Sequence, residues 1–298
     1  MSLHTVLITG ATAGIGRHLA LDLAHRGHRV FATGRKLDAL NALAEEAAKL
    51  GSHRLETLPL DVTNPENIAR AKEIVLERTG GAGVDVLINN AGYGQAGALL
   101  EISDEVLREQ FETNVFGLMA VTRAFVPGML DRRAGTVINV SSAGGRFTAP
   151  FFGAYHGTKY AVEAMSDALR IELKPFGVRV VLVEPGPVAT NFTDRSIASL
   201  PSSATSRWSA AYAKADLIRA QTDRAAVGPE AVGAAVRHAI ESTHPQARYL
   251  VPALRFRLMF ALMALTPTWA MDALFAAVFG LHSKKLNPAS GGPAAAVR

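Results

Sequence analysis

The sequence predicts a doubly wound parallel α/β sheet, built as a single domain with a C-terminal helical extension. Short apolar, β-branched runs alternate with longer segments of helical periodicity as far as about residue 250, and no repeat interrupts them. The strand-like runs are apolar throughout, as expected where helices cover both faces of a sheet. With 49% hydrophobic and 19% charged residues, the composition is that of a globular chain.

Strands and helices are expected in alternation. The predicted strands are His4–Thr9, Arg29–Thr33, Arg54–Pro59, Val84–Ile88, Thr136–Val140, Arg179–Val183 and Arg248–Val251. The predicted helices are Gly14–Arg26, Leu37–Leu50, Pro65–Arg78, Asp104–Leu130, Phe152–Lys174 and Pro229–Glu241. This alternation favours right-handed βαβ units and therefore a parallel sheet. The main domain is expected to span residues 1–250.

Two regions depart from this alternation of strands and helices. Residues 187–227 are rich in Ser, Thr and Ala and follow a predicted strand, which is typical of a mobile lid over a substrate site. Residues 251–282 are apolar and rich in Met, Leu and Phe. Arg255, Arg257, Pro267 and Asp272 divide this extension into pieces of about a dozen residues, whereas a membrane span needs about 20. We expect helices at Leu258–Leu265 and Thr268–Leu281, and a disordered tail at 283–298.

The net charge of +5 is confined to the C-terminal part of the chain. Six bases and one acid lie between Pro245 and Arg298, which leaves residues 1–244 neutral. The extension could cap a pocket, widen a subunit interface or make peripheral contact with a membrane. Nucleic acid is not an expected partner, because no basic stripe is interleaved with aromatic residues. The chain reads from Met1 directly into a strand, so we expect no signal segment and a cytoplasmic location.

The residue types present exclude several kinds of chemistry. The chain has no cysteine, which excludes disulfides, cysteine metal sites and thiol nucleophiles. The nine histidines form no metal-binding motif, so no metal is expected. Ser141 and Ser142 lie in Val-Ser-Ser-Ala-Gly, which is not the Gly-x-Ser-x-Gly of an acyl-transfer serine.

A glycine-rich turn joins the first strand to the first helix. The segment reads Thr9-Gly10-Ala11-Thr12-Ala13-Gly14-Ile15-Gly16. In this context Gly10 permits a tight turn, Gly14 lets a pyrophosphate approach the backbone, and Gly16 allows close packing of helix on strand. Phosphate groups would meet the free N–H groups at the positive end of the helix. The turn therefore predicts a dinucleotide site.

The residue after the second strand selects the dinucleotide. An NAD site places Asp or Glu there for the ribose 2′-hydroxyl, but this strand is followed by Gly34-Arg35-Lys36. The guanidinium of Arg35 is matched to a 2′-phosphate. NADP is the predicted cofactor and NAD is the alternative.

The spacing Gly-x3-Gly-x-Gly resembles that of the classical short-chain dehydrogenase/reductase family, which has a Rossmann-type fold. Further landmarks of that family follow in order: Asp61-Val62-Thr63, Asn89-Asn90-Ala91-Gly92, Asn114, Ser142, Tyr155-x3-Lys159 and Pro185-Gly186-Pro187-Val188-Ala189-Thr190. The resemblance covers about residues 3–250 and leaves out the extension. It implies a homodimer or homotetramer formed through the long fourth and fifth helices.

The motifs and the resemblance together define the expected site. The catalytic set is Asn114, Ser142, Tyr155 and Lys159. The expected cofactor contacts are Gly10, Thr12, Ala13, Gly14, Ile15, Gly16, Arg35, Asp61, Val62, Asn90, Ala91, Gly92, Tyr155, Lys159, Pro185, Gly186, Val188 and Thr190. The resemblance implies that Asp61 and Val62 hold the adenine ring and that Pro185–Thr190 contacts the nicotinamide end. Structural roles remain open for Asp61, as a cap of the helix near Pro65, and for Asn89, as a turn residue.

The catalytic chemistry follows from the residue types. Tyr155 and Lys159 are four residues apart in a predicted helix and so lie on one face. A free tyrosine with a pKa near 10 is a poor base at neutral pH, and a nearby ammonium should lower that pKa. Ser142 directly follows a strand, where its hydroxyl can donate to a substrate oxygen. The resemblance implies that Asn114 holds a water that links Lys159 to solvent, and the alternative is that its amide satisfies a local kink.

The substrate class is predicted only broadly. Five apolar residues near the expected site are Phe147, Pro150, Phe151, Phe152 and Phe192. They favour a lipophilic alcohol, ketone or aldehyde, and the alternative is that they pack the core. The leading prediction is an NADP-dependent oxidoreductase that moves a hydride to or from a carbonyl or alcohol carbon. A cofactor-binding scaffold without catalysis is disfavoured because the catalytic set is complete, and a nucleotide-sugar epimerase or dehydratase is disfavoured by the glycine spacing.

Overall fold

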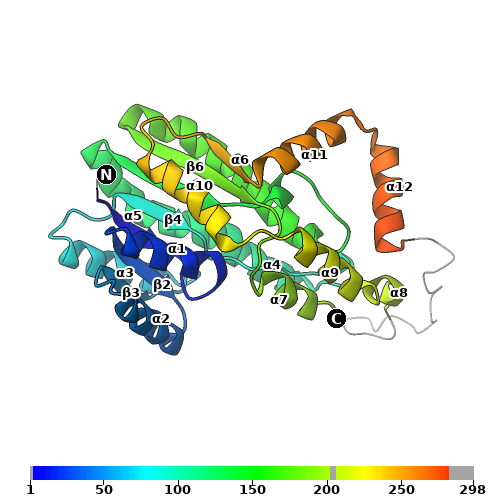
Figure 1. Ribbon diagram of the computed structural model, residues 1–298, viewed down its shortest axis with the longest axis horizontal. Helices are drawn as coiled ribbons and strands as arrows, with labels where there is room; N and C mark the ends of the chain where they lie inside the picture. Colours follow the sequence, from blue (N-terminus) through cyan, green and yellow to red (C-terminus); the bar gives the residue numbers. More distant parts are fainter. Residues whose placement is uncertain (1–2, 202–205, 282–298) are drawn as a thin grey trace, which may run out of the picture.

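The protein folds around one seven-stranded parallel sheet with the strand order β3-β2-β1-β4-β5-β6-β7. The computed structural model describes residues 3–201 and 206–281. The strands are β1 Thr5–Ile8, β2 Arg29–Gly34, β3 Leu55–Pro59, β4 Val86–Asn89, β5 Gly135–Val140, β6 Val178–Pro185 and β7 Arg248–Val251. Each predicted strand is present, and the Rossmann-type doubly wound fold is confirmed (Figure 1).

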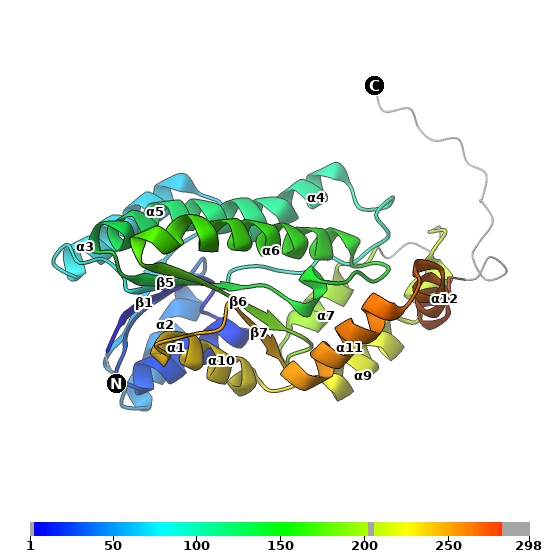
Figure 2. The ribbon, with the colours of Figure 1, turned by 90° about the horizontal axis from the view of Figure 1, so that it is seen from above.

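Helices cover both faces of the sheet and create two apolar cores (Figure 2). One face carries α1 Gly14–His25, α2 Leu37–Lys49 and α10 Pro229–Glu241. The other carries α3 Pro65–Arg78, α4 Asp104–Phe111, α5 Leu118–Arg132 and α6 Gly153–Leu173. Successive strand residues alternate between the cores: Val6 and Ile8 belong to one, and Leu7 to the other. Because both faces are covered, the strands are mostly apolar on both sides, and β1 carries Val6, Leu7 and Ile8 in succession.

The predicted helix Asp104–Leu130 is divided in the structure. A π-helical turn at Glu112–Gly117 separates α4 from α5 and contains Asn114. Ser103 caps α4 by accepting a hydrogen bond from Val106 N at 3.3 Å. π-Turns are frequent at functional sites because the extra residue re-aims a side chain. Here the turn directs Asn114 toward the loop that follows β4.

The chain after β6 is helical in most of its described part. The predicted lid contains α7 Phe192–Ala198, α8 Ser209–Tyr212 and α9 Ala215–Ala225, and its residues 202–205 lie outside the described residues. The extension forms α11 Ala253–Leu265 and α12 Thr268–Phe279. The prediction placed the start of the first of these helices too late, since the helix begins directly after Pro252. Residue 282 and the predicted tail 283–298, including Lys284, Lys285 and Arg298, also lie outside the described residues.

The extension leaves the sheet at its β7 edge. From there α11 runs away from the sheet, and α12 turns back so that its end lies near α8 (Figures 1 and 2). Within the described ranges, no helix has the length and hydropathy needed to cross a membrane.

Candidate active site

A cavity of about 1070 Å³ lies at the carboxyl ends of the strands. In an open parallel sheet, the crevice at this edge is where ligands bind. The loops after β1, β2, β3, β4, β5 and β6 all contribute residues to its walls. Residues Phe256 and Met259 of α11 and Phe279 of α12 complete it. The extension therefore forms part of the same cavity as the sheet.

The glycine-rich turn has the geometry that its sequence predicts. Gly10 and Gly14 have φ angles of +67° and +53°, which favour glycine. A Cβ on Gly16 would lie 2.3 Å from the carbonyl oxygen of Gly10, so only glycine fits between helix and strand. Ala13 precedes α1 and gives it no side-chain cap. The first N–H groups of α1 are thus available to an anion in the cavity.

The loops after β2 and β3 lie on the same side of the cavity. Arg35 is exposed and lines the cavity, and none of the described carboxylates forms an ion pair with it. Asp61 also lines the cavity, and its Oδ1 accepts hydrogen bonds from Thr63 N at 3.0 Å and Thr63 Oγ1 at 2.8 Å. The alternative that Asp61 caps the next helix is wrong, because the side chain of Asn64 caps α3.

Two neighbouring asparagines after β4 have different surroundings. Asn90 lines the cavity and donates from Nδ2 to the carbonyl oxygens of Thr9 and Gly10, both at 3.0 Å, which ties the glycine-rich turn to β4. Asn89 is buried and donates from Nδ2 to Asn139 Oδ1 at 2.9 Å and Thr122 Oγ1 at 3.0 Å. Asn89 therefore has a structural role, but as the last residue of strand β4 and not as the turn residue that the alternative interpretation proposed.

Ser142, Tyr155 and Lys159 converge on the cavity from β5 and α6. Lys159 Nζ donates to the carbonyl oxygen of Val140 at 2.9 Å and lies 5.8 Å from the centroid of the Tyr155 ring. The Ser142 hydroxyl accepts a hydrogen bond from Gly144 N at 3.0 Å. Both Tyr155 and Lys159 are buried.

Burial changes the pKa of both α6 residues. Desolvation raises the pKa of the Tyr155 phenol to about 12, and a hydrogen bond with Ser142 acts in the opposite direction. The sequence predicted a lowered pKa for Tyr155, and this is wrong for the structure, because desolvation by burial dominates and the charge of Lys159 is not among the causes that act on this phenol. Desolvation also lowers the pKa of Lys159 to about 8, while the charge of Glu163 opposes this change.

Asn114 lies behind the catalytic residues. Its Nδ2 donates to the carbonyl oxygen of Tyr93 at 2.9 Å and to Thr158 Oγ1 at 3.0 Å, and its Oδ1 accepts from Tyr93 N at 3.1 Å. An amide oxygen can accept two hydrogen bonds, so one lone pair remains. The side chain thus joins the π-helical turn, α6 and the loop after β4.

Most predicted residues line this one cavity, and a few do not. Gly16 is buried beneath the turn, and Asn114 lies behind the wall. Among the five apolar residues, Phe147, Phe152 and Phe192 line the cavity. Pro150 and Phe151 line a second cavity instead, so their predicted place near the catalytic residues is corrected.

Sequence reasoning missed His156, which also lines the cavity. Burial lowers the pKa of this imidazole to about 4, so it is neutral at physiological pH. Its ring centroid lies 5.6 Å from that of Tyr155 and 5.5 Å from that of Phe147. Its place directly after Tyr155 was the only available signal.

A buried charge cluster behind α6 was also missed. The Glu184 side chain is fully buried, with one oxygen 3.0 Å from Arg248 Nε and the other 3.4 Å from Arg146 Nη1. Arg248 Nη2 also lies 3.3 Å from Glu163 Oε2. Desolvation and the charge of Glu163 raise the pKa of Glu184 to about 7, although both arginines oppose the change. A lone glutamate in the apolar strand β6 was the signal available in the sequence.

Comparisons with known proteins show which family the chain belongs to. The family model described as short chain dehydrogenase matches residues 4–200. The uncharacterized oxidoreductase YbbO of Escherichia coli is 36% identical over 270 residues, covering 91% of this chain and 93% of that protein. The 3-ketodihydrosphingosine reductase of Bacteroides thetaiotaomicron is 34% identical over 267 residues, covering 90% and 93%.

A solved structure extends the likeness to three dimensions. Actinorhodin polyketide ketoreductase, in a variant with NADPH, has a TM-score of 0.71 and 29% sequence identity, covering 83% of this chain and 95% of that chain. The chain belongs to the short-chain dehydrogenase/reductase family. It is an NAD(P)-dependent dehydrogenase or reductase that acts on a small-molecule alcohol or ketone.

Proposed function

We propose that the protein uses NADP to transfer a hydride to or from the carbonyl or alcohol carbon of a lipophilic substrate. The observation that carries this proposal is the convergence of Ser142, Tyr155 and Lys159 on the cavity that also contains Arg35 and the glycine-rich turn. NADP, when bound, supplies or accepts the hydride. Reduction and oxidation use the same residues, so the proposal covers both directions.

The residues present fit NADP. Gly10 and Gly14 leave no side chain over the turn, and the uncapped start of α1 offers N–H groups to a pyrophosphate. Arg35 lines the cavity and makes no ion pair with the described carboxylates, so its guanidinium fork would be available to a 2′-phosphate. Asp61 and Val62 line the cavity next to it and would hold the adenine ring. The NADPH-bound ketoreductase of similar fold supports the same choice.

Ser142 and Tyr155 would hold the substrate oxygen. In reduction Tyr155 donates the proton that the carbonyl oxygen acquires, and in oxidation it takes the proton of the alcohol. Ser142 donates a hydrogen bond to the same oxygen. Lys159, with its pKa lowered to about 8 and its Nζ 5.8 Å from the centroid of the Tyr155 ring, would resupply the proton to Tyr155. The free lone pair of Asn114 Oδ1 can hold the water that connects Lys159 to solvent.

The apolar wall of the cavity supports a lipophilic substrate. Phe147, Phe152 and Phe192 lie around Tyr155, and Phe192 has its ring centroid 5.3 Å from that of Tyr155. A site with apolar walls and few polar groups binds an apolar molecule and orients it by one oxygen. The name of the relative that reduces 3-ketodihydrosphingosine points to the same class.

Titration with NADPH and with NADH tests the cofactor choice. Tryptophan fluorescence reports binding to the wild type, to Arg35→Ala and to the neighbouring control Lys36→Ala. A hydrogen-bonded charge contributes roughly 1.5–3 kcal/mol, so Arg35→Ala should weaken NADPH binding by about 10- to 150-fold and leave NADH binding unchanged. Equal binding of NADPH and NADH to the wild type would overturn the choice of NADP. Failure of both to bind would favour the scaffold alternative.

We also propose a homodimer or homotetramer formed through α4, α5 and α6. Exposed apolar side chains on this face support it: Phe116, in the π-helical turn between α4 and α5, is 53% exposed, and Ile171 on α6 is 65% exposed. Light scattering coupled to size-exclusion chromatography measures the mass in solution. A mass of one chain would contradict the proposal.

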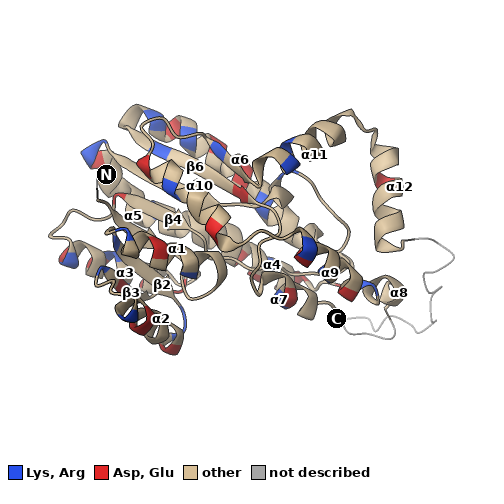
Figure 3. Cartoon of the chain, in the orientation of Figure 1, with Lys and Arg blue, Asp and Glu red and all other residues tan. Residues whose placement is uncertain are grey.

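The proposed location is the cytoplasm, with peripheral contact between the extension and a membrane. Leu254, Leu258, Leu262 and Leu265 form an exposed row along α11, and Trp269 at the start of α12 is 74% exposed. Arg255 and Arg257 lie at the beginning of that row, and the rest of α11 carries no charge (Figure 3). An apolar row flanked by bases is typical of a helix that lies in a membrane interface.

A further inference from the structure

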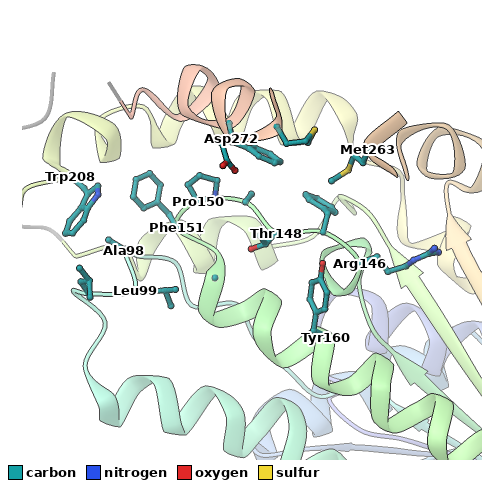
Figure 4. Close-up of a pocket in the computed structure, with 16 residues that line it drawn as sticks. Ala98, Leu99, Arg146, Thr148, Pro150, Phe151, Tyr160, Trp208, Met263 and Asp272 are labelled. Atoms are coloured by element: carbon teal, nitrogen blue, oxygen red, sulfur yellow. The ribbon is translucent and has the colours of Figure 1, made fainter. Parts of the chain in front are cut away.

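A second cavity of about 550 Å³ lies beneath the extension. Its floor is the loop from Arg146 to Phe151, and Met263, Met271 and Phe275 of α11 and α12 close it from above. Leu99 and Trp208 lie at one end, and Arg146 and Met263 lie at the other (Figure 4). The extension thus builds a cavity that the sheet and its covering helices do not form by themselves.

The lining of this second cavity is mainly apolar. Leucine, phenylalanine, proline, methionine and tryptophan side chains make up most of it. Its polar members are Arg146, Thr148, Tyr160 and Asp272, and only Arg146 and Asp272 among them are charged. Arg146 lies at the end of the cavity away from Trp208 (Figure 4). Apolar cavities of roughly 300–1,000 Å³ are of the size that binds a small-molecule ligand.

The second cavity adjoins the catalytic one. Phe147 and Ala149 line both. From Tyr155, the His156 ring is 5.6 Å away, and the Phe147 ring is a further 5.5 Å from His156. A molecule held by its oxygen at Tyr155 would therefore reach the second cavity by passing Phe147.

The backbone of Phe151 is strained in a way that shapes this cavity. Its φ of +68° is rare for a residue other than glycine and costs about 1–3 kcal/mol. The ring lies between Tyr212, with centroids 5.1 Å apart, and Phe279, with centroids 6.0 Å apart. Gly97 N donates to the Phe151 carbonyl at 2.8 Å and holds the strained residue in place. Such strain is concentrated at ligand-binding positions.

We infer that the second cavity binds the linear hydrocarbon chain of the substrate whose oxygen lies at Tyr155. The inference rests on the proposed function and narrows its substrate to long-chain ketones, aldehydes or alcohols. A flexible chain fits because it can adapt its shape to two adjoining cavities that share only Phe147 and Ala149 in their linings. On this inference, the extension determines how long a hydrocarbon chain the substrate can have, and the residues at the edge of the sheet carry out the hydride and proton transfer.

A chain-length series tests the inference through turnover. Each buried methylene should raise kcat/KM by about four-fold until the second cavity is full. Met263→Trp should fill part of that cavity and lower kcat/KM for a sixteen-carbon ketone at least ten-fold, and a six-carbon ketone should be reduced as by the wild type. Leu262→Trp, one residue away on the exposed side of α11, is the control and should change neither rate. Equal losses with both ketones, or no loss with either, would overturn the inference.

A binding measurement tests the cavity without turnover. The chain has two tryptophans, and Trp269→Phe leaves Trp208 in the cavity wall as the single reporter. An eighteen-carbon fatty acid with a nitroxide near the end of its chain should quench Trp208, whereas a water-soluble nitroxide without a chain should not. Absence of quenching would overturn the inference while leaving the NADPH titration intact. Quenching without any NADPH-linked turnover would instead refute the proposed function and keep the cavity as a chain-binding site.

Discussion

Apolar side chains are mostly buried in the body of the protein, residues 3–251, but many are exposed in the extension formed by α11 and α12. In the body, Leu7, Ile8 and Phe31 are fully buried between the sheet and its helices. In the extension, Leu262 is 66% exposed and Leu265 is 83% exposed. The same residue types thus serve two purposes. In the body they hold the fold together, and in the extension they remain available to a ligand or a surface.

The difference has a geometric cause. A strand that is covered on both faces buries every side chain, so each apolar residue of β1 has a partner. A helix that packs by one face buries only a stripe, and α11 buries Phe256 against Gly186, where a Cβ would lie 2.2 Å from the ring. Sequence hydrophobicity alone does not distinguish the two situations.

The largest expected effect concerns the chemistry of the body. Tyr155→Phe should lower kcat about 10²- to 10⁴-fold, because it removes the proposed proton donor and keeps the ring. The control is Tyr160→Phe on the same helix, outside the catalytic cavity, with rates measured on a short ketone. Near-normal turnover by Tyr155→Phe would refute the assignment of the proton donor.

The next prediction compares the stability contributed by a buried leucine of the body with that contributed by an exposed leucine of the extension. Leu7→Ala should lower the free energy of unfolding by about 2–5 kcal/mol, because it leaves a cavity beneath the sheet. Leu262→Ala removes the same atoms from the exposed side of α11 and should change the free energy by no more than about 0.5 kcal/mol. Denaturant unfolding followed by circular dichroism gives both values. A comparable loss in both variants would show that the exposed row is buried in solution.

The body could be predicted almost completely from the sequence. Apolar runs of four to eight residues can only be strands when helical segments separate them, so β1 to β7 fall where the pattern places them. The motif residues reach one cavity because the carboxyl ends of parallel strands share one edge. Local signals of this kind require no knowledge of distant contacts.

The features that were missed depend on contacts between distant segments. Four charged residues, Arg146, Glu163, Glu184 and Arg248, come from the loop before α6, from α6, from β6 and from β7, and only the fold brings their charges together. The raised pKa of Tyr155 has the same origin, because burial is a property of the assembled cavity. The left-handed backbone of Phe151 carries no glycine or asparagine signal. The second cavity could not be predicted either, because its walls come from segments that are distant in the sequence and because nothing in the sequence indicates the backbone conformation of Phe151.

A smaller effect is expected for the binding of the exposed leucine row of the extension to a membrane. Arg257→Glu reverses one charge beside that row, and roughly 1 kcal/mol per charge predicts up to about 30-fold weaker binding to vesicles of anionic lipid. Arg70→Glu makes the same change on α3 of the body and should leave binding as it is. Flotation of the protein with the vesicles gives the bound fraction. Equal flotation of both variants and the wild type would contradict the membrane contact.

The smallest expected effect concerns the buried charges through which body and extension meet. Arg146 pairs with Glu184 and lies 4.5 Å from the centroid of Phe260 on α11, so the cluster joins the two regions. Glu163 belongs to the same cluster and raises the pKa of Lys159, which burial lowers to about 8. If Lys159 must carry its proton, kcat falls as pH rises through about 8.

Replacement of Glu163 should shift the pH at which kcat falls. Glu163→Gln removes a negative charge, which lowers the pKa of Lys159 further and moves the falling limb of the kcat profile to lower pH. The maximal kcat below that limb should stay the same, because Glu163 does not touch the substrate oxygen. Asp167→Asn is the matched control: Asp167 lies 2.6 Å from Arg248 in the same cluster but is not among the charges that act on Lys159. An unmoved limb in Glu163→Gln, or an equal displacement in Asp167→Asn, would show that the cluster holds the extension against the body without tuning the catalytic lysine.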